Sequence, residues 1–416
     1  MLKQIFRMVR LTANVALLVT SPAAIAQAWS FDQIAQQALA THPAVLSRQA
    51  SSAAAQAELN GASWQRFPTP SLELGGDNNG VATTLFRLQQ PLWTGGRITA
   101  GIDAANSRHE AAEMAIGETK QELLFRIIAG YVEATRQQER AATVAKGVEQ
   151  HEQLLGMITR RVQQEASPQV DQGLAQSRLY QAANDLSQVK QALATALTQL
   201  SVLAGQPIAS VIPLDSNDAT GAGSKSGAID QAIGASLTLE RLTFDEAAAQ
   251  ADVDLKKASI LPQLSVRYEN ARASAPLNGI PGYSTSRVLL VVESQTGAGL
   301  SALSGIEAAA ARRDAIRLQR ETARRDIEER VAIDWDEWMA ARNRLDNSRF
   351  ASTSAREVAE SYTRQFTAGR KTWLDVLNTI RESTQSDVAV IDAHAQVAAA
   401  LLRLRLETGN LMGLKR

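Results

Sequence analysis

The 416-residue chain contains no cysteine, and its 43 lysines and arginines are balanced by 43 aspartates and glutamates. The lack of cysteine excludes a disulfide framework, a thiolate nucleophile, a cysteine metal site and a cysteine-linked lipid anchor. The zero formal net charge provides no bulk positive field for nucleic acid. Aromatic residues make up 5% of the chain although 45% of it is hydrophobic. A core with so few large side chains favours helices packed at short distance.

Long apolar runs are also absent. Beyond the N-terminal region no run of 18 apolar residues occurs, so we expect no transmembrane helix in the mature protein. At the N-terminus three basic residues precede an apolar run over residues 11–19, and residues 26–28 (Ala-Gln-Ala) form a small-x-small cleavage motif. This arrangement predicts a secretory signal peptide over residues 1–28. An N-terminal membrane anchor is the alternative, for which the run is short.

Proline is scarce and unevenly placed. The 11 prolines leave residues 92–167, 169–206 and 282–416 without any. Residues 306–368 lack glycine as well, and a helix over this stretch would be roughly 95 Å long. Apolar positions advance by alternating steps of four and three, as in Val144, Val148, His151, Leu155, Ile158 and Val162. Such a repeat is typical of supercoiled helices, so we expect a mainly α, elongated protein.

The chain contains an internal duplication. Residues 101–105 (Gly-Ile-Asp-Ala-Ala) match residues 305–309 (Gly-Ile-Glu-Ala-Ala) at an offset of 204, and the same offset places Asp171 on Asp375. Upstream, residues 53–57 match residues 247–251 at an offset of 194. Two copies of one unit follow from these matches. The predicted division is a first repeat at 29–205, a linker at 206–229 and a second repeat at 230–416.

Each repeat has the pattern helix, two strands, very long helix, turn, helix. The first helix is expected from Phe31 to about Trp64, ending before two prolines. Strands are expected at about 70–93 and 262–295, where apolar and polar residues alternate. Long helices are expected at about 97–165, 169–204, 300–367 and 371–408.

The four strands expected in each chain are too few to form a closed β-barrel. Open sheet edges are not tolerated in lipid. If the strands span a membrane, several chains must therefore contribute them. The alternative is two soluble hairpins packed on the helices.

Two segments resemble the TolC family of outer-membrane channel proteins. Residues 90–97 (Gln-Pro-Leu-Trp-Thr-Gly-Gly-Arg) resemble its Q-P-L-F-x-G-G-R signature, and residues 369–378 resemble its second periplasmic-tip motif, G-x-x-x-x-x-D-V-L. The resemblance implies a homotrimer with a 12-stranded outer-membrane β-barrel, continued by a long periplasmic α-helical barrel. It further implies a passive, non-enzymatic channel that works with a periplasmic adaptor (membrane fusion protein) and an inner-membrane pump.

The first tip, residues 160–171, is similar to the subgroup that serves type I secretion of adhesins. Glu165 stands where many efflux-type relatives have glycine, and Pro168 is added. The subgroup implies an inner-membrane ABC transporter and protein cargo. A multidrug or metal efflux channel with an RND-type pump is the alternative. A periplasmic helical adaptor or scaffold is an alternative of another class.

The resemblance also implies a gate at the tips and an aromatic belt at the membrane. The family's tip-to-tip link, between a carboxylate and a basic residue, maps onto Asp171 and Lys371, with Arg370 beside the latter. A family carboxylate ring maps onto Asp375, and such a ring would favour cations. Exposed charges at helix ends are the alternative. Trp64 and Trp93, near the strand ends, suit a membrane interface, with ordinary packing as the alternative.

Chemistry-bearing motifs are otherwise weak. The four histidines have no metal-ligand spacing, and we expect His151 to be a packed histidine. The acidic run over residues 326–337 lacks a partner set for acid–base catalysis, and Gly95-Gly96 lacks the Walker and dinucleotide spacings. We therefore expect no catalytic residue, no cofactor and no metal site.

Overall fold

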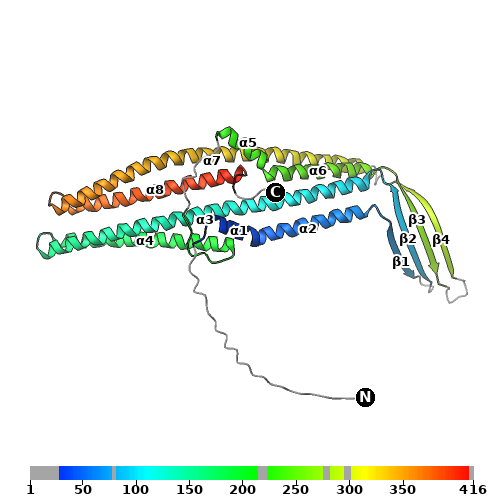
Figure 1. The fold of residues 1–416 in the computed structure, drawn as a ribbon. Helices are drawn as coiled ribbons and strands as arrows, with labels where there is room; N and C mark the ends of the chain where they lie inside the picture. Colours follow the sequence, from blue (N-terminus) through cyan, green and yellow to red (C-terminus); the bar gives the residue numbers. More distant parts are fainter. Residues whose placement is uncertain (1–27, 77–80, 214–222, 275–281, 295–300, 412–416) are drawn as a thin grey trace, which may run out of the picture.

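The computed structural model describes residues 28–76, 81–213, 223–274, 282–294 and 301–411. Residues 1–27 of the predicted signal peptide, residues 77–80 within the first predicted strand region and residues 214–222 of the predicted linker lie outside this described part. Figure 1 shows an elongated molecule, with the strands at one end and two turns between long helices at the other. Among the described residues, no helix combines the length and the hydropathy needed to cross a membrane.

The first half of the chain contains α1 (Phe31–Thr41), α2 (Pro43–Trp64), β1 (Thr69–Gly76), β2 (Ala82–Trp93), α3 (Arg97–Gln163) and α4 (Gln169–Ala204). The expectation of one continuous helix from Phe31 to Trp64 is wrong at His42. Pro43 restricts the residue before it to extended backbone and forms the first residue of a new helix. The His42 ring then accepts a hydrogen bond from the Ala44 N–H and caps α2.

The second half contains α5 (Lys225–Ala235), α6 (Leu237–Ala258), β3 (Gln263–Ala273), β4 (Tyr283–Glu293), α7 (Ser301–Thr367) and α8 (Trp373–Glu407). The starts of α1, α2 and β1 recur 194 residues later as the starts of α5, α6 and β3, and the starts of α3 and α4 recur 204 residues later as those of α7 and α8. The duplication is thus confirmed. The change of offset falls within the strand hairpins, where β3 has 11 residues against 8 in β1. Helix α5 begins inside the segment predicted as a linker.

The four strands form one antiparallel sheet in the order β1-β2-β3-β4. Each strand joins a long helical segment, so the strand order continues into a row of neighbouring helices α2, α3, α6 and α7 (Figure 1). In the other half of the molecule the row is α4, α3, α8 and α7. Helices α3 and α7 have 67 residues each, which is about 100 Å. α3 lies inside both rows, and α7 lies at the outer end of both.

The buried core forms three clusters along the helices. One joins α1, α3 and α4, its counterpart joins α5, α7 and α8, and the third lies near the two tips. In the first cluster the Tyr131 hydroxyl donates a hydrogen bond to the Ile212 carbonyl at 2.5 Å, and burial raises the pKa of Tyr131 to about 12. This bond ties the segment after α4 to the middle of α3.

Candidate functional site

One face of the sheet is apolar and exposed. Leu72 pairs with Phe86, and Leu88 with Tyr268, across neighbouring strands. The large exposed residues of this face are Leu72, Leu74, Phe86, Leu88, Tyr268, Val288, Leu290 and Val292. An apolar surface that runs across four strands is typical of an interface with lipid or with another protein.

The opposite face of the sheet is polar and carries alternating charges. Arg87 lies 3.0 Å from the Glu73 carboxylate on β1 and 3.5 Å from that of Glu269 on β3. Arg287 of β4 lies 2.8 Å from Glu269. Although Glu269 is in a strand, its side chain is only 8% exposed, because neighbouring arginines cover it. Such cross-strand pairs stabilise a sheet, and this row was not predicted from the sequence, although Glu73 and Arg87 stand at the polar positions of the alternation.

The sheet is open at both edges. Within the described residues, β1 pairs only with β2, and β4 pairs only with β3. Edge strands with unpaired backbone groups are templates for pairing with another chain. The sheet thus has two unpaired edge strands, one apolar face and one polar face.

Trp64 and Trp93 both lie where helices meet strands. Trp64 is the last residue of α2, is 69% exposed and contacts Phe67 at 5.2 Å between ring centroids. Trp93 is the last residue of β2 and is 50% exposed. Within the single chain neither tryptophan is part of a buried core.

At the opposite end, the first tip ends α3 in a left-handed turn. Glu165 has a φ of 56°, the Glu165 N–H donates to the Val162 carbonyl, and the Ala166 N–H donates to the Arg161 carbonyl. This is a Schellman motif, whose left-handed position usually holds glycine. The sequence departure at Glu165 therefore coincides with the strained residue of the turn.

The second tip has the same turn with glycine in the left-handed position. Gly369 has a φ of 74°, and the Arg370 N–H donates to the Gln365 carbonyl. Arg370 is exposed, whereas the Lys371 ammonium lies 4.2 Å from the centroid of the Tyr362 ring. Lys371 is thus held by a cation–π contact on its own hairpin.

Asp171 and Asp375 occupy corresponding positions but differ in their contacts. The Asp375 carboxylate accepts hydrogen bonds from the Thr372 N–H at 3.2 Å and its hydroxyl at 2.9 Å, which completes a capping box. These bonds hold the pKa of the Asp375 carboxyl below its usual value. α4 instead begins after Pro168, which offers no side-chain cap. Within the described part of one chain, Asp171 forms no ion pair with Lys371.

The two tips pack against each other through a contact that the sequence did not predict. The Arg161 guanidinium lies 4.5 Å from the centroid of the Phe366 ring, and both belong to hairpins that are far apart in the sequence. Val376 and Leu377 of α8 join Leu154 and Ile158 of α3 in the buried cluster beneath. No local pattern identifies such a contact, because it depends on how the hairpins lie side by side.

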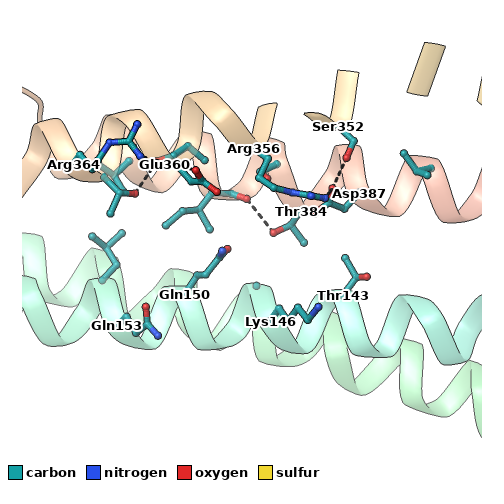
Figure 2. Close-up of a pocket in the computed structure, with 18 of the residues that line it drawn as sticks. Thr143, Lys146, Gln150, Gln153, Ser352, Arg356, Glu360, Arg364, Thr384 and Asp387 are labelled. Atoms are coloured by element: carbon teal, nitrogen blue, oxygen red, sulfur yellow. Dashed lines mark hydrogen bonds and ion pairs between the residues drawn. The ribbon is translucent and has the colours of Figure 1, made fainter. Parts of the chain in front are cut away.

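A polar groove of about 800 Å³ lies between α3 and the α7–α8 hairpin, and Figure 2 shows it from the side. Lys146 and Gln150 line it from α3, and the Asp387 carboxylate opposite accepts bonds from Ser352 at 2.5 Å and Arg356 at 2.9 Å. The Asp387 charge is thus paired within the protein, whereas Lys146 forms no ion pair among the described residues. Within the described residues no group of three His, Cys, Asp or Glu side chains could hold a metal ion. His151 is half-buried against α4, and burial with the charge of Arg178 lowers its pKa.

A buried acidic cluster lies near the end of α8. Arg403 contacts Asp334 at 2.8 Å and Glu337 at 2.6 Å. The Glu407 side chain is 5% exposed, and its nearest cation is Arg330 at 3.3 Å. Burial, together with the charge of Asp334, raises the pKa of the Glu407 carboxyl to about 7.

The exposed apolar sheet face, the polar face behind it and the long helical body are typical of a protein that inserts its sheet into a membrane. The sequence profile of the outer membrane efflux protein family matches residues 34–206 and 228–410, and the chain belongs to this family. It is an outer-membrane channel that extends into the periplasm and has no enzymatic activity. The predicted localisation and the resemblance to the TolC family are thus confirmed at the level of the family.

Several solved structures share the fold. The outer membrane protein VceC of Vibrio cholerae is 16% identical, with a TM-score of 0.78 over 91% of this chain and 96% of that one. The CmeC outer membrane channel of Campylobacter jejuni is 13% identical, with a TM-score of 0.76 over 93% and 87%. The MtrE outer membrane channel of Neisseria gonorrhoeae, solved in an open state, is 15% identical, with a TM-score of 0.76 over 91% and 88%. No curated protein sequence matches the chain significantly.

Proposed function

We propose that three copies of the chain form a 12-stranded barrel in the outer membrane, continued by an α-helical tunnel through the periplasm. The observation that supports this most is the sheet, with an apolar face, a charged face and two free edges. A barrel of such sheets turns the apolar face to lipid and the charged face to the lumen, and leaves no edge unpaired. Trp64 and Trp93 then stand at the periplasmic boundary of the membrane.

We further propose that the trimer is the passive duct of a type I protein secretion system for adhesin-like cargo. Its partners are then a periplasmic adaptor (membrane fusion protein) and an inner-membrane ABC transporter. The support is the first tip, which resembles that subgroup, and in which Glu165 occupies the left-handed turn that glycine occupies in the second tip. The family assignment disfavours the periplasmic scaffold. A multidrug or metal efflux channel with an RND-type pump is the second candidate, favoured by the efflux description of the family.

Two measurements test these proposals. Outer-membrane fractionation with unheated gel electrophoresis is expected to give a heat-dissociable trimer, whereas a periplasmic monomer would overturn the channel. Deletion of the gene is expected to abolish the secreted adhesin and to leave drug and metal tolerance unchanged. Unchanged secretion with lost tolerance would assign the channel to efflux instead.

The gate at the narrow end is proposed to be formed between protomers. Asp171 has no cationic partner among the described residues of its own chain. Arg370 and Lys371 lie on the α7–α8 hairpin, and α7 is the outer helix of its row, where the next copy of the proposed trimer would lie. Asp375 lies one turn inside the tip, where three copies would form a ring of carboxylates that favours cations. The combination of Asp171→Ala and Lys371→Ala is expected to raise single-channel conductance in planar bilayers.

A matched control is Asp185→Ala, which removes an exposed carboxylate from the same helix, away from the tip. It is expected to leave the conductance unchanged. Equal conductance of the tip variant and the wild type would eliminate the gate at these residues.

A further inference from the structure

The long helices α3 and α7 are counterparts in the two repeats but have different surroundings. Both have 67 residues, yet 18 residues are buried on α3 and 10 on α7. None of the exposed large apolar residues lies on α3, whereas α7 carries Leu303, Leu318, Ile333, Met339, Phe350 and Val358. α3 has neighbours on both sides in its row, and α7 has a neighbour on one side only. Within the described part of the chain, the outer side of α7 therefore has no neighbouring helix in the position that α6 occupies beside α3.

Inside the chain, that neighbour of α3 is α6, which belongs to the other repeat. The Arg108 guanidinium of α3 lies 2.6 and 2.7 Å from the two carboxylate oxygens of Asp252 on α6. Close by, a Cβ atom added to Gly101 of α3 would meet Leu255 of α6 at 3.7 Å. One ion pair and one close approach thus mark the junction between the repeats.

The duplication supplies both members of this ion pair a second time. Arg312 of α7 corresponds to Arg108 at the offset of 204, and Glu58 of α2 corresponds to Asp252 at the offset of 194. The charges are retained, but α7 and α2 lie at opposite ends of the helix row (Figure 1). Both side chains are exposed, and neither forms an ion pair within the described part of the chain. A Cβ atom added to Gly305, the counterpart of Gly101, would meet nothing within 4 Å.

We propose that Arg312 of one protomer pairs with Glu58 of the next copy, and that this contact reproduces the Arg108–Asp252 pair between chains. The occupant of the open side of α7 is accordingly α2 of a second copy of this chain. The inference rests on the proposed trimer and specifies which helices meet and in which register. Around the closed ring, three junctions within chains then alternate with three junctions between chains. Because the internal pair is solvent-accessible, with side chains 49% and 42% exposed, the pair between chains selects register more than it supplies affinity.

Chemical cross-linking tests the pair directly, since the wild-type chain contains no cysteine. The double variant Glu58→Cys with Arg312→Cys, assembled in the outer membrane and treated with a short bismaleimide, is expected to give covalent dimers and trimers on a heated gel. The matched control, Arg108→Cys with Asp252→Cys, is expected to cross-link within the chain and to run as a monomer. A second control, Glu58→Cys with Asp326→Cys, replaces an exposed residue of α7 and places the thiols out of register by 14 residues, about 21 Å. It is expected to give only monomer on the heated gel.

Charge reversal provides an independent measurement. Glu58→Arg is expected to lower the temperature at which the unheated trimer dissociates, and adding Arg312→Glu is expected to restore it. The wild type can form a stable trimer while the Glu58→Cys, Arg312→Cys variant gives only monomer after cross-linking and heating. This result would overturn the proposed pair and leave the proposed channel intact. A wild type that is monomeric before heating overturns the proposed trimer, and the pair with it.

Discussion

Replacement of Glu407 by glutamine is expected to stabilise the protein in a strongly pH-dependent way. The folded carboxyl has a pKa of about 7, whereas the reference value is 4.5. Between these two values the folded chain holds a proton that the unfolded chain releases, so the free energy of unfolding falls as the pH rises. This difference in pKa corresponds to about 3 kcal/mol of lost folding stability. The loss is complete above about pH 7 and absent below about pH 4.5.

The groups around Glu407 explain why the cost is not relieved in the native protein. Asp334 of α7 is a second buried carboxylate, and its own pKa is raised, chiefly by burial. Arg403 serves Asp334 and Glu337, which leaves Arg330 as the cation nearest to Glu407. Glutamine has the shape of the protonated acid and carries no charge, so it removes the cost of burying an ionised group.

The assay is denaturation of the detergent-solubilised protein, followed by circular dichroism at several pH values from 4.5 to 8. The free energy of unfolding of Glu407→Gln is expected to exceed that of the wild type by about 3 kcal/mol per chain at pH 8. At pH 4.5 the two values are expected to be equal. The control Glu337→Gln removes a carboxylate that is 56% exposed and also contacts Arg403, and its effect is expected to stay below about 1 kcal/mol. Parallel stability curves for Glu407→Gln and the wild type would refute a titration of Glu407 near pH 7.

Three further outcomes are expected. Glu165→Gly should raise the free energy of unfolding by up to about 1 kcal/mol, because glycine adopts the left-handed turn without strain, whereas Gly369→Ala should lower it; thermal unfolding measures both. Tyr131→Phe should lower the free energy of unfolding by about 1 kcal/mol, since it removes the hydrogen bond to the Ile212 carbonyl, and the same unfolding experiment detects the loss. Leu290→Arg should disrupt barrel assembly, with a cost of about 2–4 kcal/mol on the lipid-facing side, while Leu289→Arg, one residue away on the opposite face, should be tolerated; the amount of heat-dissociable trimer in the outer membrane compares them.

The long helices and the duplication could be predicted because their signals are local or repeat at fixed distances. The lack of proline and glycine over residues 306–368 corresponds to an unbroken stretch of α7. The alternation of apolar and polar residues at about 70–93 and 262–295 identified the strands. The break at His42 was missed although Pro43 signals it, because the apolar pattern continues across it.

The contacts at the two ends of the molecule could not be predicted, because they depend on packing between distant segments. The Arg161–Phe366 contact and the charge row through Arg87 and Glu269 each join residues from different repeats. The raised pKa of Glu407 likewise arises from burial that no local pattern encodes. For the gate residues, the structure accounts for Asp375 as a helix cap and leaves the Asp171–Lys371 link as a prediction about neighbouring chains.

The unequal length of the two strand hairpins has a consequence at the cell surface. β3 continues three residues past Asn270, the counterpart of the last residue of β1, and β4 begins three residues before Ser286, the counterpart of the first residue of β2. Three residues of strand are about 10 Å. The outer rim of the proposed trimer would therefore be a crown of three tall hairpins alternating with three short ones. An antibody or a phage that approaches the bacterium would meet the second repeat of each chain first.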